Sequence, residues 1–353
     1  GSIFWMWVTA IIGIATKFFT CTLSVMYREK TKEGEIFGGP MYVIKNGLPK
    51  RMLPLAYFFA LAGMIGCLPA FQSNQLIQIT GDLAFSEIEN FNIFGGLVLA
   101  GITGIVVIGG LKRIAEVATF LVPLMGSIYF GAMLIALILN LDQVFPAFKL
   151  ILVDAFNGTA IAGGTFFGVL IYGVRRGAFS NEAGMGTESL VHGVAKVSDP
   201  VKQGLVAMTG PIFDTLIICT ATALMILISG VWETSASQGV TLTAEAFRML
   251  LGNFGGFILF TCVICFGLST IFTYSYYGAS CSRFLFGKFG MKFYIYLYIF
   301  SIFIYSIVPI DIAINIADGA FAMMAIPTLV SALWLAPKVM QASKNYFKLI
   351  GSY

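Results

Sequence analysis

Residues 159–188 read Thr159-Ala-Ile-Ala-Gly-Gly-Thr-Phe-Phe-Gly-Val-Leu-Ile-Tyr-Gly-Val-Arg-Arg-Gly-Ala-Phe-Ser-Asn-Glu-Ala-Gly-Met-Gly-Thr-Glu188, an apolar run that seven glycines interrupt. Each glycine weakens a helix by about 1 kcal/mol relative to alanine. Glycines four residues apart, such as Gly164 and Gly168, would equally allow two helices to pack closely. Because close packing needs only two or three of the seven, the segment predicts an interrupted helix.

The composition of the whole chain places this helix in a lipid bilayer. Of 353 residues, 58% are hydrophobic and 11% are charged, and the mean hydropathy is +0.89. A soluble domain carries about 25% charged residues. The net charge of +4 indicates no nucleic-acid partner, and a single histidine excludes a His-rich metal site. Six cysteines in apolar surroundings fit helix packing better than redox chemistry. We therefore expect an all-α polytopic membrane protein without a cofactor.

A membrane helix needs about 20 apolar residues. The sequence predicts about nine such spans, at residues 3–26, 53–80, 93–110, 116–140, 158–174, 204–231, 254–278, 293–309 and 318–337. Residues 235–252 predict an amphipathic helix on the exterior side, which ends at Gly252.

The basic residues support one orientation of these spans. Lys and Arg are enriched in cytoplasmic loops, and alternate loops hold 18 of the 21 basic residues, including Arg175 and Arg176. This pattern predicts a multi-pass protein of the cell membrane with a cytoplasmic C-terminus.

An interrupted helix within a membrane must line a cavity or be buried in protein. Secondary transporters use such helices to bind substrate and coupling ion. Within this segment we select Phe167 and Gly168 as substrate-binding candidates, and Asn181 and Glu182 as candidates for conformational gating. Asp214 lies early in the sixth span and is a third gating candidate, although it can instead cap a helix or pair near its cytoplasmic end.

Two further polar groups lie within apolar spans. Ser269 and Thr270 offer adjacent hydroxyl oxygens of the kind that Na⁺ accepts, but such hydroxyls also bond to the carbonyl four residues earlier. Gln72 and Asn74 belong to a row of polar side chains in the second span. This row predicts the wall of a polar cavity, or else a wet surface near the exterior.

Long motifs distributed along the chain resemble the alanine/glycine:cation (sodium:alanine) symporter family. They are Phe4-Trp-Met-Trp-Val-Thr-Ala-Ile-Ile-Gly13, Gly38-Gly-Pro-Met-Tyr42, Arg176-Gly-Ala-Phe-Ser-Asn-Glu-Ala-Gly-Met-Gly186, Gln203-Gly-Leu-Val-Ala-Met208, Asp214-Thr-Leu-Ile-Ile-Cys-Thr-Ala-Thr-Ala-Leu224, Leu268-Ser-Thr-Ile271 and Asn315-Ile-Ala-Asp318. The resemblance spans essentially the whole chain.

The resemblance implies a leucine-transporter-type fold of two inverted five-helix repeats in one transmembrane domain, residues 1–353. The first repeat would be partial, over residues 1–140, and the second would span residues 158–340. In family members two helices precede the Phe-Trp-Met-Trp span. We therefore expect an N-terminally truncated chain that lacks the first core helix and does not transport alone.

The resemblance also implies roles for single residues. Gln72 and Asn74 match a Gln-x-Asn near the substrate, and Thr270 and Tyr274 match a Thr and a Trp beside it. Ser269 and Thr270 occupy the place of a sodium-ligating pair. The chain departs from the family around this pocket, for example at Ile171, which leaves strict alanine or glycine specificity open.

Together these features predict sodium-coupled symport of small neutral amino acids, such as alanine or glycine, by a monomer that uses alternating access. A proton-coupled transporter and a non-transporting amino-acid sensor on the same fold are the alternatives. An enzyme is not expected, because the apolar spans hold no cluster of nucleophile, base or metal ligands.

Overall fold

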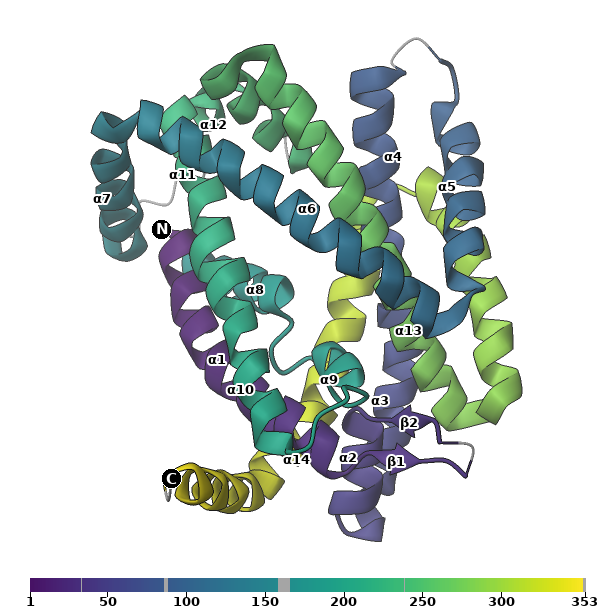
Figure 1. The fold of residues 1–353 in the computed structure, drawn as a ribbon. Helices are drawn as coiled ribbons and strands as arrows, with labels where there is room; N and C mark the ends of the chain where they lie inside the picture. Colours follow the sequence, from purple (N-terminus) through teal and green to yellow (C-terminus); the bar gives the residue numbers. More distant parts are fainter. Residues whose placement is uncertain (33, 86–87, 158–165, 238, 352–353) are drawn as a thin grey trace.

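The computed structural model describes residues 1–32, 34–85, 88–157, 166–237 and 239–351, which form a bundle of long helices with a short β hairpin at one end (Figure 1). The elements in chain order are α1 (Ser2–Met26), β1 (Glu29–Lys30), β2 (Ile36–Phe37), α2 (Pro40–Gly47), the 3₁₀ helix η1 (Lys50–Met52), α3 (Leu53–Gly66), α4 (Ala70–Ala84), α5 (Phe91–Val107), α6 (Gly110–Leu139), α7 (Leu141–Asn157), α8 (Phe166–Asn181), α9 (Thr187–His192), α10 (Pro200–Pro211), the π-helix η2 (Ile212–Cys219), α11 (Thr220–Ser229), α12 (Val231–Thr234), α13 (Val240–Ile307) and α14 (Ile310–Ile350).

The helical prediction is confirmed. Within the described part of the chain, six helical stretches are long and apolar enough to cross a membrane, and α5 is a shorter apolar helix. One of the six is α13, whose 68 residues bend at Gly252 and at Gly287, where φ is +68° and +69°. The predicted spans 254–278 and 293–309 are thus two arms of α13, and the predicted exterior helix forms its first segment, which ends at Gly252 as expected.

Several elements differ from the sequence prediction, and two of the differences lie before α8. Residues 141–157, which we expected to be a loop, form α7, because Ala147, Ile151 and Ala155 recur every four residues and are buried on one face. The predicted span 53–80 is divided into α3 and α4. The division falls before Pro69, which has no backbone N–H to continue the helical hydrogen bonds of α3.

The helices form two packed groups, one around α1 and one around α13. The first is α1 with α8 and α10, where a Cβ at Gly204 would lie only 2.1 Å from Thr22 Oγ1. In the second, α13 packs against α3, α4, α5 and α6. The two long arms of α13 are joined by the Tyr298 hydroxyl, which donates to the Ile271 carbonyl at 2.6 Å. In Figure 1, the β hairpin and α2 lie at one end of the bundle, and α7 and α12 lie at the other.

Candidate functional site

In the described residues the helix interruption lies after α8, within the predicted segment 159–188. Residues 158–165 of the predicted break are outside the described residues, and the chain from Phe166 to Asn181 is a continuous helix. The backbone then enters the left-handed region at Glu182, Gly184 and Gly186, with φ of +55°, +83° and +91°, before α9 begins. Left-handed backbone is unusual for a side chain as large as that of glutamate and often marks a functional site.

This break lies deep within the bundle. A Cβ at Gly177 of α8 would lie 3.0 Å from the Thr9 Cβ of α1, and one at Gly184 would lie 3.3 Å from Thr16 Cγ2. The segment from α8 through the break thus runs beside a helix that is long and apolar enough to cross the membrane.

The Glu182 carboxylate joins the break to α13. Tyr274 donates its hydroxyl to Glu182 Oε1 at 2.6 Å, and Thr187 donates to Oε2 at 2.6 Å. Both donors are buried, with 5% and 0% of their surface exposed. A charged acceptor with two buried donors makes strong hydrogen bonds. The structure therefore brings together Glu182 and Tyr274, which the sequence analysis placed in different roles.

Asn181, the other predicted gating residue, stabilises the turn itself. Its Oδ1 accepts from the Ala183 backbone N–H at 2.9 Å. Its Nδ2 is buried beside Gly13 of α1 and has no hydrogen-bond partner among the described residues. A buried amide donor without an acceptor is costly, by about 1–3 kcal/mol, and such groups can mark a ligand position.

Tyr274, which donates to Glu182, belongs to an aromatic cluster. It links four helices, α4, α8, α13 and α14, through edge-on or tilted ring pairs whose centroids are 5.5–6.3 Å apart. Its members are Phe71, Phe179, Phe321, Tyr274 and Tyr277. This cluster was not predicted, because aromatic residues in separate apolar spans give no sign that they meet.

The predicted cation ligands lie one turn before Tyr274 on α13. Ser269 and Thr270 both donate their hydroxyl hydrogen to the Phe266 carbonyl at 2.9 Å. Hydrogen bonding to a carbonyl of the preceding turn is the alternative to cation binding that the sequence allowed. It still leaves lone pairs on both oxygens, which is what a hard cation needs.

The other predicted substrate residues lie on α4 and α8. Asn74 of α4 donates to the Val308 carbonyl at 2.6 Å, at the C-terminal end of α13. Gln72 is half-buried on the same helix. Phe167 and Gly168 are exposed near the start of α8, with Phe167 68% exposed.

Asp214 lies in the π-helix η2, where it accepts hydrogen bonds from Ser180 of α8 and from Thr215. Asp214 therefore links η2 to α8, which agrees with the alternative that it pairs with a neighbouring group. A π-helix is rare and often occurs at functional sites.

The assignment of Arg175 and Arg176 to an inside loop is wrong. Both residues lie within α8 and form ion pairs with Asp318 of α14. The Arg176 guanidinium also lies 5.4 Å from the centre of the Tyr172 ring and 5.9 Å from that of Phe179. Because Asp318 offsets their charges, the two arginines do not end the helix, although their side chains remain 49% and 31% exposed.

Glu188 begins the short helix α9 and is 4% exposed. Thr20 of α1 donates to its Oε1 at 2.9 Å, and the Gly186 N–H donates to its Oε2 at 3.1 Å. Burial raises the pKa of Glu188 from 4.5 to about 7, although Lys17 and the Thr20 hydrogen bond act in the opposite direction. Nearby, burial lowers the pKa of His192 from 6.5 to about 4.

We expect Glu188→Gln to gain stability relative to the unmodified protein as the pH rises. The folded-state pKa of Glu188 is above its unfolded value, so its contribution is complete below pH 4.5 and is lost as the pH rises through about 7. The difference in unfolding free energy between the two proteins should change by about 3 kcal/mol across this window. Thermal unfolding in detergent between pH 4.5 and 8 measures it. His192 is common to both proteins and cancels in the difference, and a constant difference would contradict the prediction.

A bundle of apolar helices with an interrupted segment between them is typical of a multi-pass membrane transporter. The family model for the sodium:alanine symporter family matches residues 1–351, and the chain belongs to this family.

The relatives with curated names agree with this assignment. The uncharacterized transporter YflA of Bacillus subtilis is 36% identical, over 98% of this chain and 74% of its own length. The sodium/alanine symporter AgcS of Methanococcus maripaludis is 36% identical, over 98% of this chain and 77% of its own. The probable sodium/glutamine symporter GlnT of Bacillus subtilis is 33% identical, over 98% and 72%.

Proposed function

We propose that the protein couples Na⁺ entry to the uptake of a small neutral amino acid, such as alanine or glycine, across the cell membrane by alternating access. The observation that carries the proposal is the Glu182–Tyr274 hydrogen bond. It joins the break after α8 to the helix that bears the Ser269–Thr270 hydroxyl pair. Membership of a sodium symporter family supports Na⁺ as the coupling ion.

The proposed architecture is the leucine-transporter-type inverted repeat, with about nine membrane helices in this chain. A single domain of residues 1–353 would hold a partial first repeat over residues 1–140 and a second over residues 158–340. The protein would work as a monomer. Its C-terminus would be cytoplasmic, because basic residues gather at the end of the bundle that holds the β hairpin and such residues favour the cytoplasmic side.

Within this architecture Ser269 and Thr270 would bind Na⁺ through their free lone pairs. Thr270 and Tyr274 would contact the amino acid, with Gln72, Asn74, Phe167 and Gly168 completing the site in other conformations of the transport cycle. Glu182, Asn181 and Asp214 would control the conformational change, because their hydrogen bonds tie α8 and the break to neighbouring elements.

Substituting the hydroxyl pair tests the proposed cation site. We expect Ser269→Ala and Thr270→Ala each to raise the Na⁺ concentration for half-maximal uptake by about tenfold or more, because each removes an oxygen ligand worth roughly 1–3 kcal/mol. Radiolabelled alanine uptake into liposomes that contain the full-length protein measures this. Thr261→Ala is the matched control, since Thr261 is exposed on α13 and is also back-bonded, to Phe257 at 3.0 Å. An unchanged Na⁺ dependence in both variants would exclude the site.

A further inference from the structure

Helix α14 is about twice as long as the apolar core of a membrane is thick. Its 41 residues, from Ile310 to Ile350, rise about 60 Å at about 1.5 Å per residue. The hydrocarbon core of a bilayer is about 30 Å thick. The first part of α14 suits this core, because no lysine or arginine occurs in it before Lys338. Residues 338–350 therefore exceed the length that the core needs.

Aromatic and basic residues mark the level at which α14 leaves the membrane. Trp334 is 52% exposed and lies one turn before Lys338. Lys338 donates to the Tyr27 hydroxyl at 3.0 Å, and Tyr27 directly follows the last residue of α1. Trp and Tyr are enriched where a membrane meets water. The helices α1 and α14 thus reach the same interface at this end of the bundle.

Beyond this level the chain turns away from the bundle. Figure 1 shows the last part of α14 almost end-on beside the C label, whereas the rest of α14 runs along the bundle. Pro337 lies inside α14, and a proline bends a helix because it removes a backbone hydrogen bond. Val339 is buried, but residues 340–351 are all half-buried or exposed. We call residues 338–350 the surface helix.

The surface helix has an apolar face. At about 100° per residue, five apolar side chains fall within an arc of about 120°. They are Val339, Met340, Tyr346, Phe347 and Ile350. Leu349 is the one large apolar side chain of the surface helix outside this arc. Met340, Phe347 and Ile350 are 49%, 52% and 52% exposed, so the described part of the protein leaves much of the arc uncovered.

The rest of the circumference is positively charged. Residues 338–350 include three lysines and no acidic residue. Lys344 and Lys348 are exposed, and they lie four residues apart beside the apolar arc. Neither forms an ion pair with a described residue. Their charges are therefore available to anions outside the protein.

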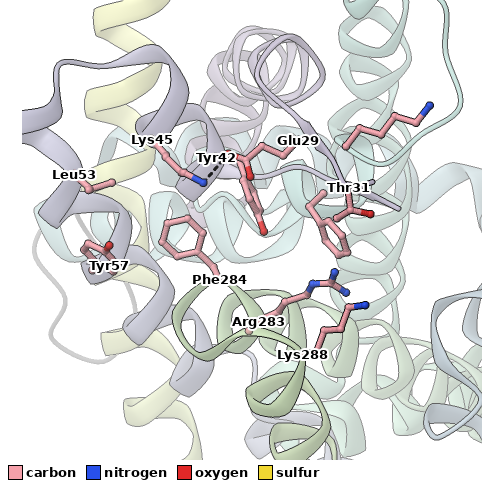
Figure 2. A pocket seen from close by; sticks show the side chains of 12 residues that line it. Glu29, Thr31, Tyr42, Lys45, Leu53, Tyr57, Arg283, Phe284 and Lys288 are labelled. Carbon is pink, nitrogen blue, oxygen red and sulfur yellow. Dashed lines mark ion pairs between the residues drawn. The ribbon is translucent and has the colours of Figure 1, made fainter. Parts of the chain in front are cut away.

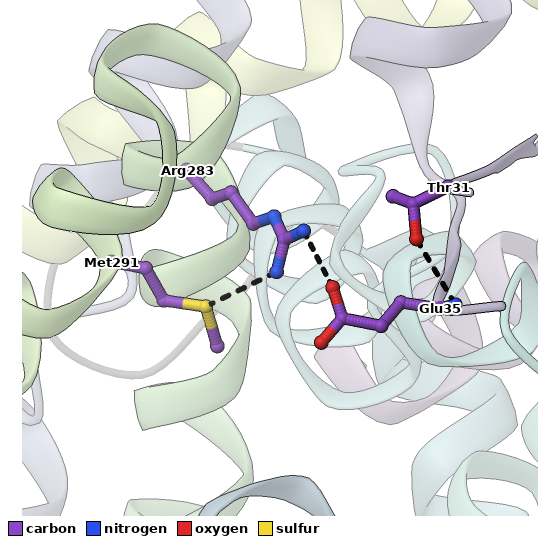
Figure 3. A network of polar contacts seen from close by, with 4 residues as sticks. All are labelled: Thr31, Glu35, Arg283 and Met291. Carbon is purple, nitrogen blue, oxygen red and sulfur yellow. Dashed lines mark hydrogen bonds and ion pairs between the residues drawn. The ribbon is translucent and has the colours of Figure 1, made fainter. Parts of the chain in front are cut away.

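Other cations at this end of the bundle are bound to acids of the protein itself. Lys45 pairs with Glu29 at 2.8 Å (Figure 2), and Arg283 pairs with Glu35 at 2.7 Å (Figure 3). These ion pairs hold the β hairpin against α2 and α13. The two lysines beside the apolar arc differ from them, since they serve no such contact within the described residues.

We infer that the surface helix lies in the headgroup region of the membrane, with its apolar arc against the acyl chains and with Lys344 and Lys348 bound to anionic phospholipids. A helix with one apolar face and one lysine-rich face favours this position. Lysines close to an anionic membrane surface add electrostatic attraction. The membrane is also the nearest apolar partner, because the arc continues directly from a stretch that is apolar enough to cross it. The inference does not depend on which substrate the protein transports.

Fluorescent labelling of the full-length protein in liposomes tests this position. The polarity-sensitive label NBD is attached to the new cysteine of Met340→Cys, on the apolar arc. Asn345→Cys, which lies on the opposite face, is the matched control. The liposomes contain phosphatidylcholine alone or mixed with phosphatidylglycerol, and they carry a quencher on the acyl chains. The unmodified protein, which has six cysteines, measures the background label.

A second pair of variants tests the role of the lysines. Lys344→Gln/Lys348→Gln is combined with the label at position 340. Its control is Lys50→Gln/Arg51→Gln with the same label, because these two exposed cations lie outside the surface helix and their loss changes the net charge equally. Circular dichroism confirms that each variant is folded.

With phosphatidylglycerol present, we expect quenching at position 340 to be about twofold or more stronger than at position 345. Lys344→Gln/Lys348→Gln should lose most of this difference, and the control should keep it. Equal quenching at the two positions would overturn the inference, because the arc would then not face the acyl chains. Equal quenching at position 340 with and without phosphatidylglycerol, or equal losses in the lysine variant and its control, would overturn the binding of anionic lipid.

Discussion

Replacing Glu182 by alanine is expected to abolish Na⁺-driven uptake and to lower the free energy of unfolding by about 3 kcal/mol. The reason is that Tyr274 and Thr187 both donate to this carboxylate at 2.6 Å and are buried. Without the acceptor, each hydroxyl is left unsatisfied at about 1–3 kcal/mol. Uptake into liposomes and thermal unfolding in detergent measure the two effects.

A double-mutant cycle separates this contact from simple packing. Glu182→Gln and Tyr274→Phe should each reduce uptake by about tenfold or more, and together they should reduce it no further, because the two groups act as a unit. Tyr277→Phe is the control, since Tyr277 is also buried and its ring centre lies 5.5 Å from that of Tyr274. Losses that multiply would show that Glu182 and Tyr274 act independently.

Replacing Gly186 by alanine is expected to destabilise the protein by about 4 kcal/mol. Its φ of +91° disfavours any side chain. An added Cβ would also lie 2.6 Å from Pro40 Cγ, 2.6 Å from Thr328 Oγ1 and 2.8 Å from Phe59 Cε2. These atoms belong to three different helices, so no single small movement relieves the overlap.

Gly34→Ala is the matched control for Gly186→Ala. Gly34 has a similar φ of +87°, but nothing lies within 4 Å of an added Cβ. Its substitution should therefore show the backbone cost alone, about 1 kcal/mol. Thermal unfolding of both variants measures the difference. Equal effects would mean that the packing around Gly186 is loose.

The sequence was sufficient to predict the helical class and to place an interruption within residues 159–188, but not to say at which glycines it occurs. Glycines in 159–188 predicted an interruption, and the described part of the segment continues as a helix to Asn181. The left-handed turn at Gly184 and Gly186 follows Asn181, whose side chain accepts from the Ala183 backbone N–H. Glycine content alone does not distinguish such a turn from close helix packing, which is what Gly173 and Gly177 provide against α1.

The site was less predictable than the fold, because it depends on contacts between distant residues. Glu182 and Tyr274 are 92 residues apart, and no local pattern links them. Arg175 and Arg176 suggested a surface loop because their partner, Asp318, lies in the last helix. Hydropathy and loop charge depend on local sequence only, so they cannot predict an ion pair between remote segments.

A transport measurement on the reconstituted protein tests the proposed sodium-coupled uptake of an amino acid. The full-length protein in liposomes would be given radiolabelled alanine, glycine or glutamine under an inward gradient of Na⁺, of K⁺ or of protons. If the protein is a sodium-coupled symporter, we expect a small neutral amino acid to accumulate above its external concentration with the Na⁺ gradient alone. Accumulation with the proton gradient but not with Na⁺, or binding without uptake under any gradient, would contradict it.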